Sequence, residues 1–319
     1  MSTPLAPWQQ RAHDQAVATL AEGRLGHALL LCGPPQLGQR AVAERLAAHL
    51  LGAHDPRAAH LLQAGTHPDF HLVTLLPNRE GTKLRTEIVI EQIRELSEKL
   101  ALTPQYGGVQ VAIVDPADAI NVAAANALLK TLEEPRPGRY LWLLASNPSR
   151  LPATIRSRCQ RLEFRLPPRD EALAWLRAQG HSDQAATEAL DAARGHPGLA
   201  DAWLHDGGMA LRREVAADLA KLARGELAPI ETAQRWVADE DAALRLRHAA
   251  DLALAEAAGL TDPARIGKLA QWFDAANRTR DLLRTTVRAD LAVAELLLAW
   301  RGREAQGATA RATGGRGQR

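Results

Sequence analysis

Residues 107–164 carry the pattern that decides the fold: GGVQVAIVDPADAINVAAANALLKTLEEPRPGRYLWLLASNPSRLPATIRSRCQRLEF. After a Gly-Gly turn, apolar runs over residues 109–114 and 141–145 predict two strands, and residues 161–164 predict a third. Between the first two strands, apolar residues recur every three or four positions and predict a helix. The members of its apolar stripe are Val122, Ala125, Leu129 and Leu132. Pro135 ends this helix, because a residue before proline is pushed out of the helical region.

Strands that are apolar on both faces and joined by a helix indicate a parallel sheet covered by helices. Binding sites of such sheets lie beyond the carboxyl ends of the strands. Asp115 and Asn147 directly follow two predicted strands. We therefore expect both residues, together with the region of Arg158, to lie at that edge of the sheet.

A glycine loop, GPPQLGQR over residues 33–40, lies between a predicted strand at 28–32 and a predicted helix at 41–51. Gly33 and Gly38 have the spacing of the phosphate-binding pattern G-x-x-x-x-G-K-[ST]. Gln39 stands where that pattern has the lysine that neutralises nucleotide phosphates. Arg40 stands where it has the Ser or Thr hydroxyl that ligates magnesium.

Asp115 occupies the position of the acidic residue on the magnesium side of such a site. The next position, where a glutamate would activate water in this class of ATPase, is Pro116. These departures predict that the chain holds no nucleotide cofactor and does not hydrolyse ATP. The backbone amides at the helix N-terminus still attract anions, so the sequence leaves open whether the loop binds one.

The bulk properties are those of a soluble globular protein: 319 residues, 46% apolar, 24% charged, with a net charge of +2 that selects no partner. The two cysteines, Cys32 and Cys159, are far apart and form no disulfide framework, which indicates a reducing compartment. The N-terminus lacks a signal-peptide pattern, and no apolar run is long enough to span a bilayer. We expect a cytoplasmic protein with no membrane partner.

Histidines gather around residues 52–69, which are expected to form an irregular insertion. His54, His60 and His67 lie inside it, with His49 and His71 just outside. Structural zinc sites usually rely on cysteine thiolates at short paired spacing, and the insertion has none. The sequence therefore predicts no metal site and favours surface or capping histidines.

The remaining pattern is mainly helical. Residues 10–22 and 86–101 predict amphipathic helices and residues 70–76 a strand, and Pro167-Pro168 marks a boundary. Small helices follow over 169–204, and longer ones over 208–300. The terminal helix, 281–300, has a broad apolar band that fits either oligomer packing or an internal bundle core. Residues 302–319 are Gly-rich and basic and are expected to be disordered.

The glycine loop, Asp115, the run AAANALLKTLEEP at 123–135 and Ser157-Arg158-Cys159 together resemble the AAA+ clamp-loader family of bacterial DNA polymerase III. The resemblance covers roughly residues 20–300. It implies an α/β nucleotidase-like domain with a parallel sheet (1–165), a small helical lid (166–206) and an all-α collar that assembles the ring (207–301). The tail, 302–319, lies outside these domains.

The resemblance also implies roles for individual residues. Arg158 is expected to reach across an interface, as an arginine finger, to the ATP of a neighbouring subunit, while Ser157 and Cys159 are structural. Active relatives carry a phosphate-sensing arginine in the lid, and this chain has Gly198 near that position. Some relatives hold zinc through four cysteines, which this chain lacks. The implied function is a non-hydrolysing subunit of the polymerase holoenzyme, without polymerase activity of its own, that helps load the sliding clamp onto primed DNA.

Three alternatives stay open at this point. Arg158 pairs with a local carboxylate and is structural only. The chain is an active AAA+ ATPase motor subunit with an unusual phosphate loop. Or it binds DNA directly through arginines near 85–94 and 150–161.

Overall fold

The computed structural model of this chain describes residues 4–52, 55–78, 80–82, 84–106, 108–283 and 285–313, with the side chains of 302–313 left out of the description. Three predicted features lie outside the described residues: His54, Gly107 and the last part of the predicted tail, 314–319. The chain forms two compact units that divide between Leu199 and Ala200. The expected α/β domain and the first helices of the expected lid therefore share one unit. The expected lid boundary at residue 206 is not where the compact units divide.

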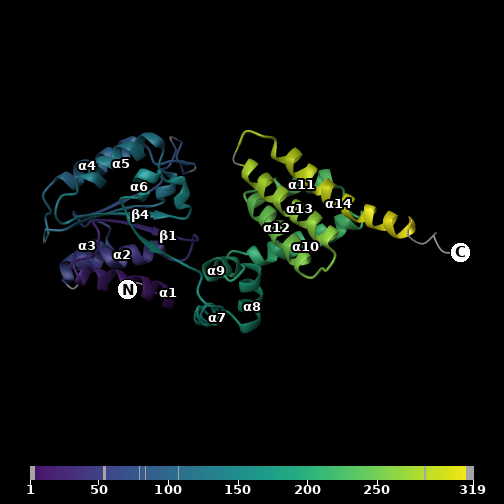
Figure 1. The fold of residues 1–319 in the computed structure, drawn as a ribbon, viewed down its shortest axis with the longest axis horizontal. Helices are drawn as coiled ribbons and strands as arrows, with labels where there is room; N and C mark the ends of the chain where they lie inside the picture. The colour runs from purple at the N-terminus through teal and green to yellow at the C-terminus, as the bar shows by residue number, and fades with distance from the viewer. Residues whose placement is uncertain are drawn as a thin grey trace. The chain divides into compact units, whose positions relative to one another are not determined.

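The first unit is built on a five-stranded sheet (Figure 1). Its strands are β1 (Ala28–Cys32), β2 (Phe70–Val73), β3 (Gln110–Val114), β4 (Arg139–Ala145) and β5 (Gln160–Glu163). Every pairing is parallel, and the order is β2-β3-β4-β1-β5. The predicted parallel sheet is confirmed. The predicted strand at 70–76 is shorter than expected and ends at Val73.

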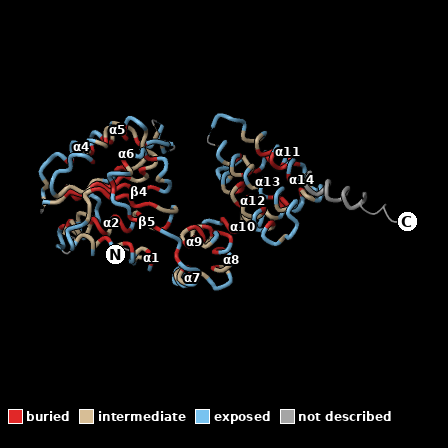
Figure 2. The backbone as a smooth tube through the Cα atoms, in the orientation of Figure 1, coloured by how far each residue is buried: buried red, intermediate tan, exposed pale blue. Residues whose placement is uncertain are grey.

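Helices cover both faces of the sheet (Figure 1). On one face lie α4 (Ile90–Ala101), α5 (Val122–Glu133) and α6 (Ala153–Arg156), and on the other α1 (Pro7–Ala21) and α2 (Gln39–Leu50). Along β1, Leu30 packs into the first layer and Leu29 and Leu31 into the second. This two-sided burial, visible as the buried strands of Figure 2, explains why the strands are continuous apolar runs.

Two local predictions are wrong. Residues 52–69 are not irregular throughout, because α3 (Pro56–Gln63) forms within them. Pro56 fits the first helical turn, and the Asp55 carboxylate accepts from the backbone N–H of Arg57 at 3.0 Å, which caps the helix. In α5, Val122 is 77% exposed rather than part of the buried stripe, since it directly follows the N-cap Asn121, and the helix buries Leu128 instead.

Three helices follow the sheet: α7 (Arg169–Ala178), α8 (Asp183–Ala192) and α9 (Pro197–His205). The second unit holds α10 (Gly208–Ala223), α11 (Pro229–Trp236), α12 (Ala242–Ala258), α13 (Pro263–Leu282) and α14 (Ala289–Thr313). Three buried tryptophans, Trp236, Trp272 and Trp300, lie in its apolar core. Among the described residues, no helix is both long enough and apolar enough to cross a membrane.

The C-terminal helix differs from its prediction at both ends. The expected helix 281–300 is interrupted between Leu282 and Ala289, where the Thr285 hydroxyl donates to the Leu282 carbonyl at 2.7 Å and closes a turn. Its apolar band is divided: Leu297 is buried in the core, whereas Leu291 and Leu298 are exposed. The backbone stays helical to Thr313, beyond the predicted boundary at 302, since alanine, arginine and glutamate favour helix there.

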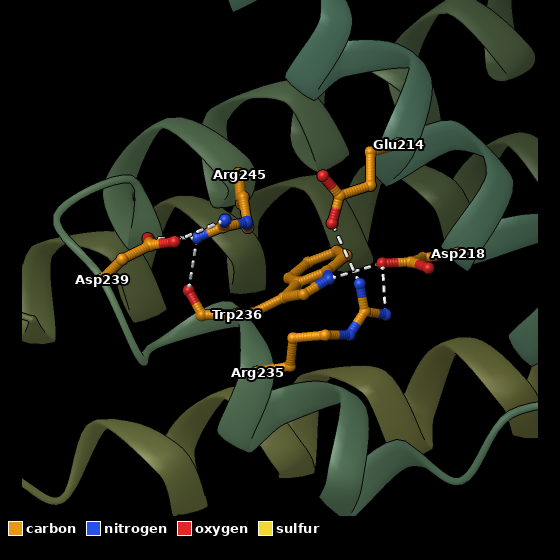
Figure 3. A network of polar contacts seen from close by, with 6 residues as sticks. All are labelled: Glu214, Asp218, Arg235, Trp236, Asp239 and Arg245. Carbon is orange, nitrogen blue, oxygen red and sulfur yellow. Dashed lines mark hydrogen bonds and ion pairs between the residues drawn. The ribbon is translucent and has the colours of Figure 1, made fainter.

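A network of polar contacts joins neighbouring helices of the second unit (Figure 3). Its members are Glu214, Asp218, Arg235, Trp236, Asp239 and Arg245. The Arg235 guanidinium donates to Glu214 at 2.9 Å and to Asp218 at 2.8 Å, which links α11 to α10. Arg245, on α12, donates to the Trp236 carbonyl at 3.1 Å and to Asp239. The bond from Arg245 lowers the pKa of Asp239 to about 2.

Candidate functional site

The candidate residues lie at two places on opposite edges of the sheet: the carboxyl edge, where the parallel strands end, and the amino edge, where they begin. The loop corner, residues 33–40 with Asp115, follows the carboxyl ends of β1 and β3. The arginine corner, Ser157, Arg158 and Cys159, directly precedes β5, whose first residue Gln160 pairs with Leu29 near the start of β1. The expectation that Arg158 lies at the carboxyl edge is therefore wrong. A residue that precedes a parallel strand is placed at the amino edge.

The backbone path of the loop corner requires both glycines, and packing requires Gly33. Gly33 has φ +150°, and a Cβ there would lie 2.3 Å from the Phe164 carbonyl oxygen. Gly38 caps α2 in the left-handed region at φ +88°, and its Cβ would lie 2.1 Å from Gln9 Nε2. The loop therefore has the backbone path that glycines permit. Gly33 also lies against the backbone of Phe164, directly after β5, and Gly38 lies against the Gln9 side chain of α1.

The polar groups of the loop bond within the protein. The Gln39 side-chain amide donates to the Pro34 carbonyl at 2.6 Å and to the Gly33 carbonyl at 3.2 Å. The Leu37 carbonyl accepts from the Trp8 indole at 2.9 Å and from Gln9 at 3.1 Å. Gln39 thus stabilises the turn through hydrogen bonds to its carbonyls. It stands at the position where a phosphate-binding loop presents a positive charge to its ligand.

Arg40 and Asp115 form an internal ion pair. The Arg40 guanidinium lies 3.3 Å from the Asp115 carboxylate and 2.8 Å from the Glu44 carboxylate one turn along α2. Burial raises the pKa of Asp115, and the nearby Arg40 charge opposes that rise without cancelling it. The acidic residue expected on the magnesium side of a nucleotide site therefore faces an arginine. An arginine has no atom that ligates a metal.

The segment 196–199, which follows the sheet in the chain, packs onto the loop. His196 Nδ1 accepts from the Leu199 N–H at 3.1 Å, so Nε2 carries the proton and donates to the Pro35 carbonyl at 2.7 Å. At Gly198, on the first turn of α9, a Cβ would lie 1.9 Å from the Gln36 carbonyl oxygen. A side chain at residue 198 would thus displace the loop backbone. The structure therefore leaves no room for an arginine side chain at residue 198.

Helix α7 packs against α1 beside the loop, through an ion pair and an aromatic contact. Arg11 makes a bidentate ion pair with Glu171, at 2.7 and 2.8 Å. Trp8 and Trp175 pack edge to face with ring centroids 5.3 Å apart. A cavity of about 250 Å³ remains at the loop, bounded by Gln39, Arg40, Asp115 and Ser146 among others. It is smaller than the roughly 300–1,000 Å³ of pockets that hold small ligands.

The arginine corner is fixed by its neighbours. Ile155, on α6, is fully buried, and Cys159 is 9% exposed, so the backbone on both sides of Arg158 is anchored in the core. The Ser157 hydroxyl donates to the Thr154 carbonyl at 3.1 Å. Burial raises the pKa of the Cys159 thiol to about 11. Cys159 is therefore a protonated core residue at neutral pH, and Ser157 stabilises the turn.

The Arg158 side chain lies at the surface in a defined position. It is 37% exposed and bonds through one guanidinium nitrogen to the Thr154 carbonyl at 2.8 Å, and through the other to the Glu133 carboxylate at 2.7 Å. The local carboxylate that sequence reasoning considered as an alternative partner is therefore present. Glu133 itself was missed, although the run LEEP at 132–135 was part of the recognised motif.

The described histidines near the α3 segment have separate surroundings. His67 accepts from the backbone N–H of Asp69 at 3.2 Å, and the Asp69 carboxylate in turn accepts from the N–H groups of Gln105 and Tyr106. Among the described residues, none of these histidines lies with two other His, Cys, Asp or Glu ligand atoms closely enough to share a metal ion. His67 and Asp69 therefore belong to a loop-capping arrangement.

Comparison with known proteins shows the family to which this chain belongs. The family described as DNA polymerase III, delta subunit matches residues 8–168. DNA polymerase III subunit delta' of Pseudomonas aeruginosa is 37% identical over 240 residues, 72% of this chain and 70% of its own length. The chain belongs to the DNA polymerase III subunit delta' family. Its first unit has the α/β fold with a parallel sheet that the sequence predicted.

Two further relatives extend the comparison. The delta' subunit of Escherichia coli K12 is 37% identical over 203 residues, 61% of this chain and 59% of its own length. A solved structure, a DNA polymerase III gamma subunit-related protein from Thermotoga maritima, has 19% identity and a TM-score of 0.48, with 91% of this chain and 99% of that chain covered.

Proposed function

We propose that this chain is a non-hydrolysing subunit of a cytoplasmic DNA polymerase III clamp loader. In this proposal it joins a hetero-oligomeric ring with ATP-binding subunits and helps to load the sliding clamp onto primer–template DNA. It contributes to the polymerase holoenzyme without ATPase or polymerase activity of its own. Residues 166–206 act as the lid and 207–301 as the collar of the ring.

The observation that carries the non-hydrolysing role is the internal satisfaction of the loop corner. Gln39 bonds to loop carbonyls, and Arg40 neutralises Asp115. Nucleotide hydrolysis needs a lysine on the phosphates, a hydroxyl on magnesium and a free acidic residue. None of these three parts is offered by the side chains at residues 39, 40 and 115. The contact between Gly198 and Gln36 removes the space for a sensing arginine as well.

The placement of Arg158 supports a role toward a neighbour. Extending the pairing of β1 with β5 puts Arg158 at the level of His27. From His27 to Gly33 the chain advances six residues, about 3.3 Å each, or roughly 20 Å. An arginine side chain cannot bridge that distance, so Arg158 cannot serve the loop of its own chain. Its exposure leaves it accessible to the phosphates of a nucleotide in an adjacent subunit.

The decisive experiment is the DNA- and clamp-stimulated ATPase of the reconstituted loader, with wild-type chain against Arg158→Ala. An arginine finger is worth about 10³–10⁵ in rate where it has been measured, so turnover should fall at least tenfold. Gel filtration must show that the complex still assembles. Unchanged turnover in an intact complex would leave Arg158 structural and remove the finger from the proposal.

A separate measurement tests the non-hydrolysing role. Isothermal titration of the isolated chain with Mg-ATP should give no heat of binding at micromolar concentrations. Micromolar binding would instead favour the alternative of a motor subunit with an unusual phosphate loop. The two experiments are independent, because the first concerns the nucleotide of a neighbour and the second the loop of this chain.

A further inference from the structure

We propose that Glu133 is the positioning residue for Arg158: its carboxylate holds the guanidinium in the orientation from which it meets the neighbour's nucleotide. This inference rests on the proposed finger role of Arg158. The Glu133 carboxylate is negatively charged and would not contact a phosphate. Glu133 would therefore act through Arg158 and not as a catalytic group.

The contact geometry restrains the guanidinium at two points. The Glu133 carboxylate lies 2.7 Å from one terminal nitrogen of Arg158, and the Thr154 carbonyl accepts from the other at 2.8 Å. A guanidinium is planar and has five N–H groups in a fixed fork. Two partners on its two terminal nitrogens therefore define the plane of the whole group.

Both partners are mounted on rigid backbone. Glu133 is the last residue of α5, which is held to the sheet by the buried side chains of Leu128 and Leu132. Thr154 belongs to α6, which packs against α5 and buries Ile155 completely. The two bonds to Arg158 thus join two fixed elements. An arginine on a free surface would otherwise sample many rotamers, and ordering it costs conformational entropy.

The restraint leaves donors for a ligand. The two contacts account for two of the five N–H groups, and among the described residues Arg158 has no other partner. With 37% of the side chain exposed, the remaining N–H groups are available to an anion that arrives from outside. A neighbour's phosphate can then bind while Glu133 and Thr154 remain bonded. Preorganised donors of this kind stabilise developing charge without reorganisation at the moment of reaction.

The test is steady-state ATPase of the reconstituted loader with clamp and primed DNA. Four preparations are compared: wild type, Glu133→Gln, Arg158→Ala, and the double variant. The matched control is Glu134→Gln, because Glu134 is the adjacent carboxylate and has no contact with Arg158 among the described interactions. Gel filtration and thermal denaturation check assembly and folding. Because Glu133 is half-exposed, its substitution should change neither.

Glu133→Gln should lower kcat about two- to fivefold, the factor that corresponds to a partly exposed ion pair. The KM for ATP should stay within twofold, and Glu134→Gln should match wild type. In the Arg158→Ala background, Glu133→Gln should have no further effect, because a positioning residue loses its influence with the group it positions. A merely structural carboxylate would lower stability or assembly and would not show this dependence.

Other results overturn the proposal in distinguishable ways. If Arg158→Ala lowers turnover and Glu133→Gln does not, the finger stands and the positioning role falls. Turnover above wild type in Glu133→Gln would mean that Glu133 restrains the finger. An equal loss in both backgrounds would mean that Glu133 acts elsewhere. If Arg158→Ala has no effect, the finger role fails, and the positioning role with it.

Discussion

The loop corner and the arginine corner carry the same kind of side chain and use it in opposite ways. Arg40 pairs with two carboxylates, Asp115 and Glu44, beside a Gln39 amide that bonds only to the loop itself. Arg158, at the opposite edge of the sheet, pairs with one carboxylate, Glu133, and with the neutral carbonyl of Thr154.

This difference shows how a ligand site is lost in one place and retained in another within one domain. A phosphate-binding loop becomes inert when its donors and acceptors find partners inside the protein, because a ligand must then displace existing bonds. An arginine keeps its capacity for an anion when its partners order it without neutralising its charge twice over, as the two carboxylates around Arg40 do. The pattern of partners, more than the residue type, separates the two corners.

The largest effect should come from a pair of identical substitutions, Arg158→Lys and Arg40→Lys. The first should reduce loader ATPase at least tenfold, because a lysine keeps the charge but lacks the planar fork. The second should leave turnover within twofold, since its charge only balances Asp115 and Glu44. The same stimulated ATPase measurement serves both. A strong loss in Arg40→Lys would mean that the loop corner still takes part in nucleotide chemistry.

A smaller effect should follow from alanine at two helical glycines. Gly198→Ala places a methyl group 1.9 Å from the Gln36 carbonyl oxygen and should cost about 1–3 kcal/mol of stability. Gly267→Ala, on α13 with no neighbour within 4 Å, should instead stabilise by about 0.5–1 kcal/mol through helix propensity. Thermal denaturation of the full chain measures both. A neutral Gly198→Ala would show that α9 does not close on the loop in solution.

The smallest effect should be a pH-dependent gain in Asp115→Asn. Burial raises the pKa of Asp115 in the folded chain above its unfolded value of about 3.9. The folded state then binds more protons than the unfolded state in that window, so the contribution of Asp115 to stability falls as pH rises through the folded pKa. At pH 7 the variant should therefore be more stable than wild type, by less than about 1 kcal/mol.

Urea denaturation at pH 7 and at pH 3.5 checks the sign. The advantage of Asp115→Asn should shrink at the lower pH, because the raised pKa of Asp115 makes the folded wild-type carboxyl take up a proton as the pH falls. A loss of stability at pH 7 would show that the Arg40 ion pair outweighs the cost of burial. The loop corner would then be held by that pair more than by its packing against α1 and β5.

The sequence by itself determined the parallel sheet, the family and the residues to examine. Apolar strand runs and the helix ending at Pro135 depend on local spacing and burial on both faces, which a single chain displays directly. The loss of the phosphate-binding lysine and of the magnesium-binding hydroxyl at Gln39 and Arg40 was also evident from the sequence. The motif has a fixed spacing, so the residue at each of its positions can be identified without a structure. Local signals also existed for α3, in Asp55 and Pro56, although the segment was predicted to be irregular.

Tertiary structure decided where these residues lie and what they bond to. Arg158 lies at the amino edge, against expectation, because it precedes β5 and β5 runs parallel to β1. The order of these residues was readable in the sequence, whereas the direction of β5 is given by its pairing with β1. The partners Glu133, Asp115 and Gln36 are 25, 75 and 162 residues from Arg158, Arg40 and Gly198. Contacts over such separations depend on how whole elements pack, and a local sequence pattern does not contain that information.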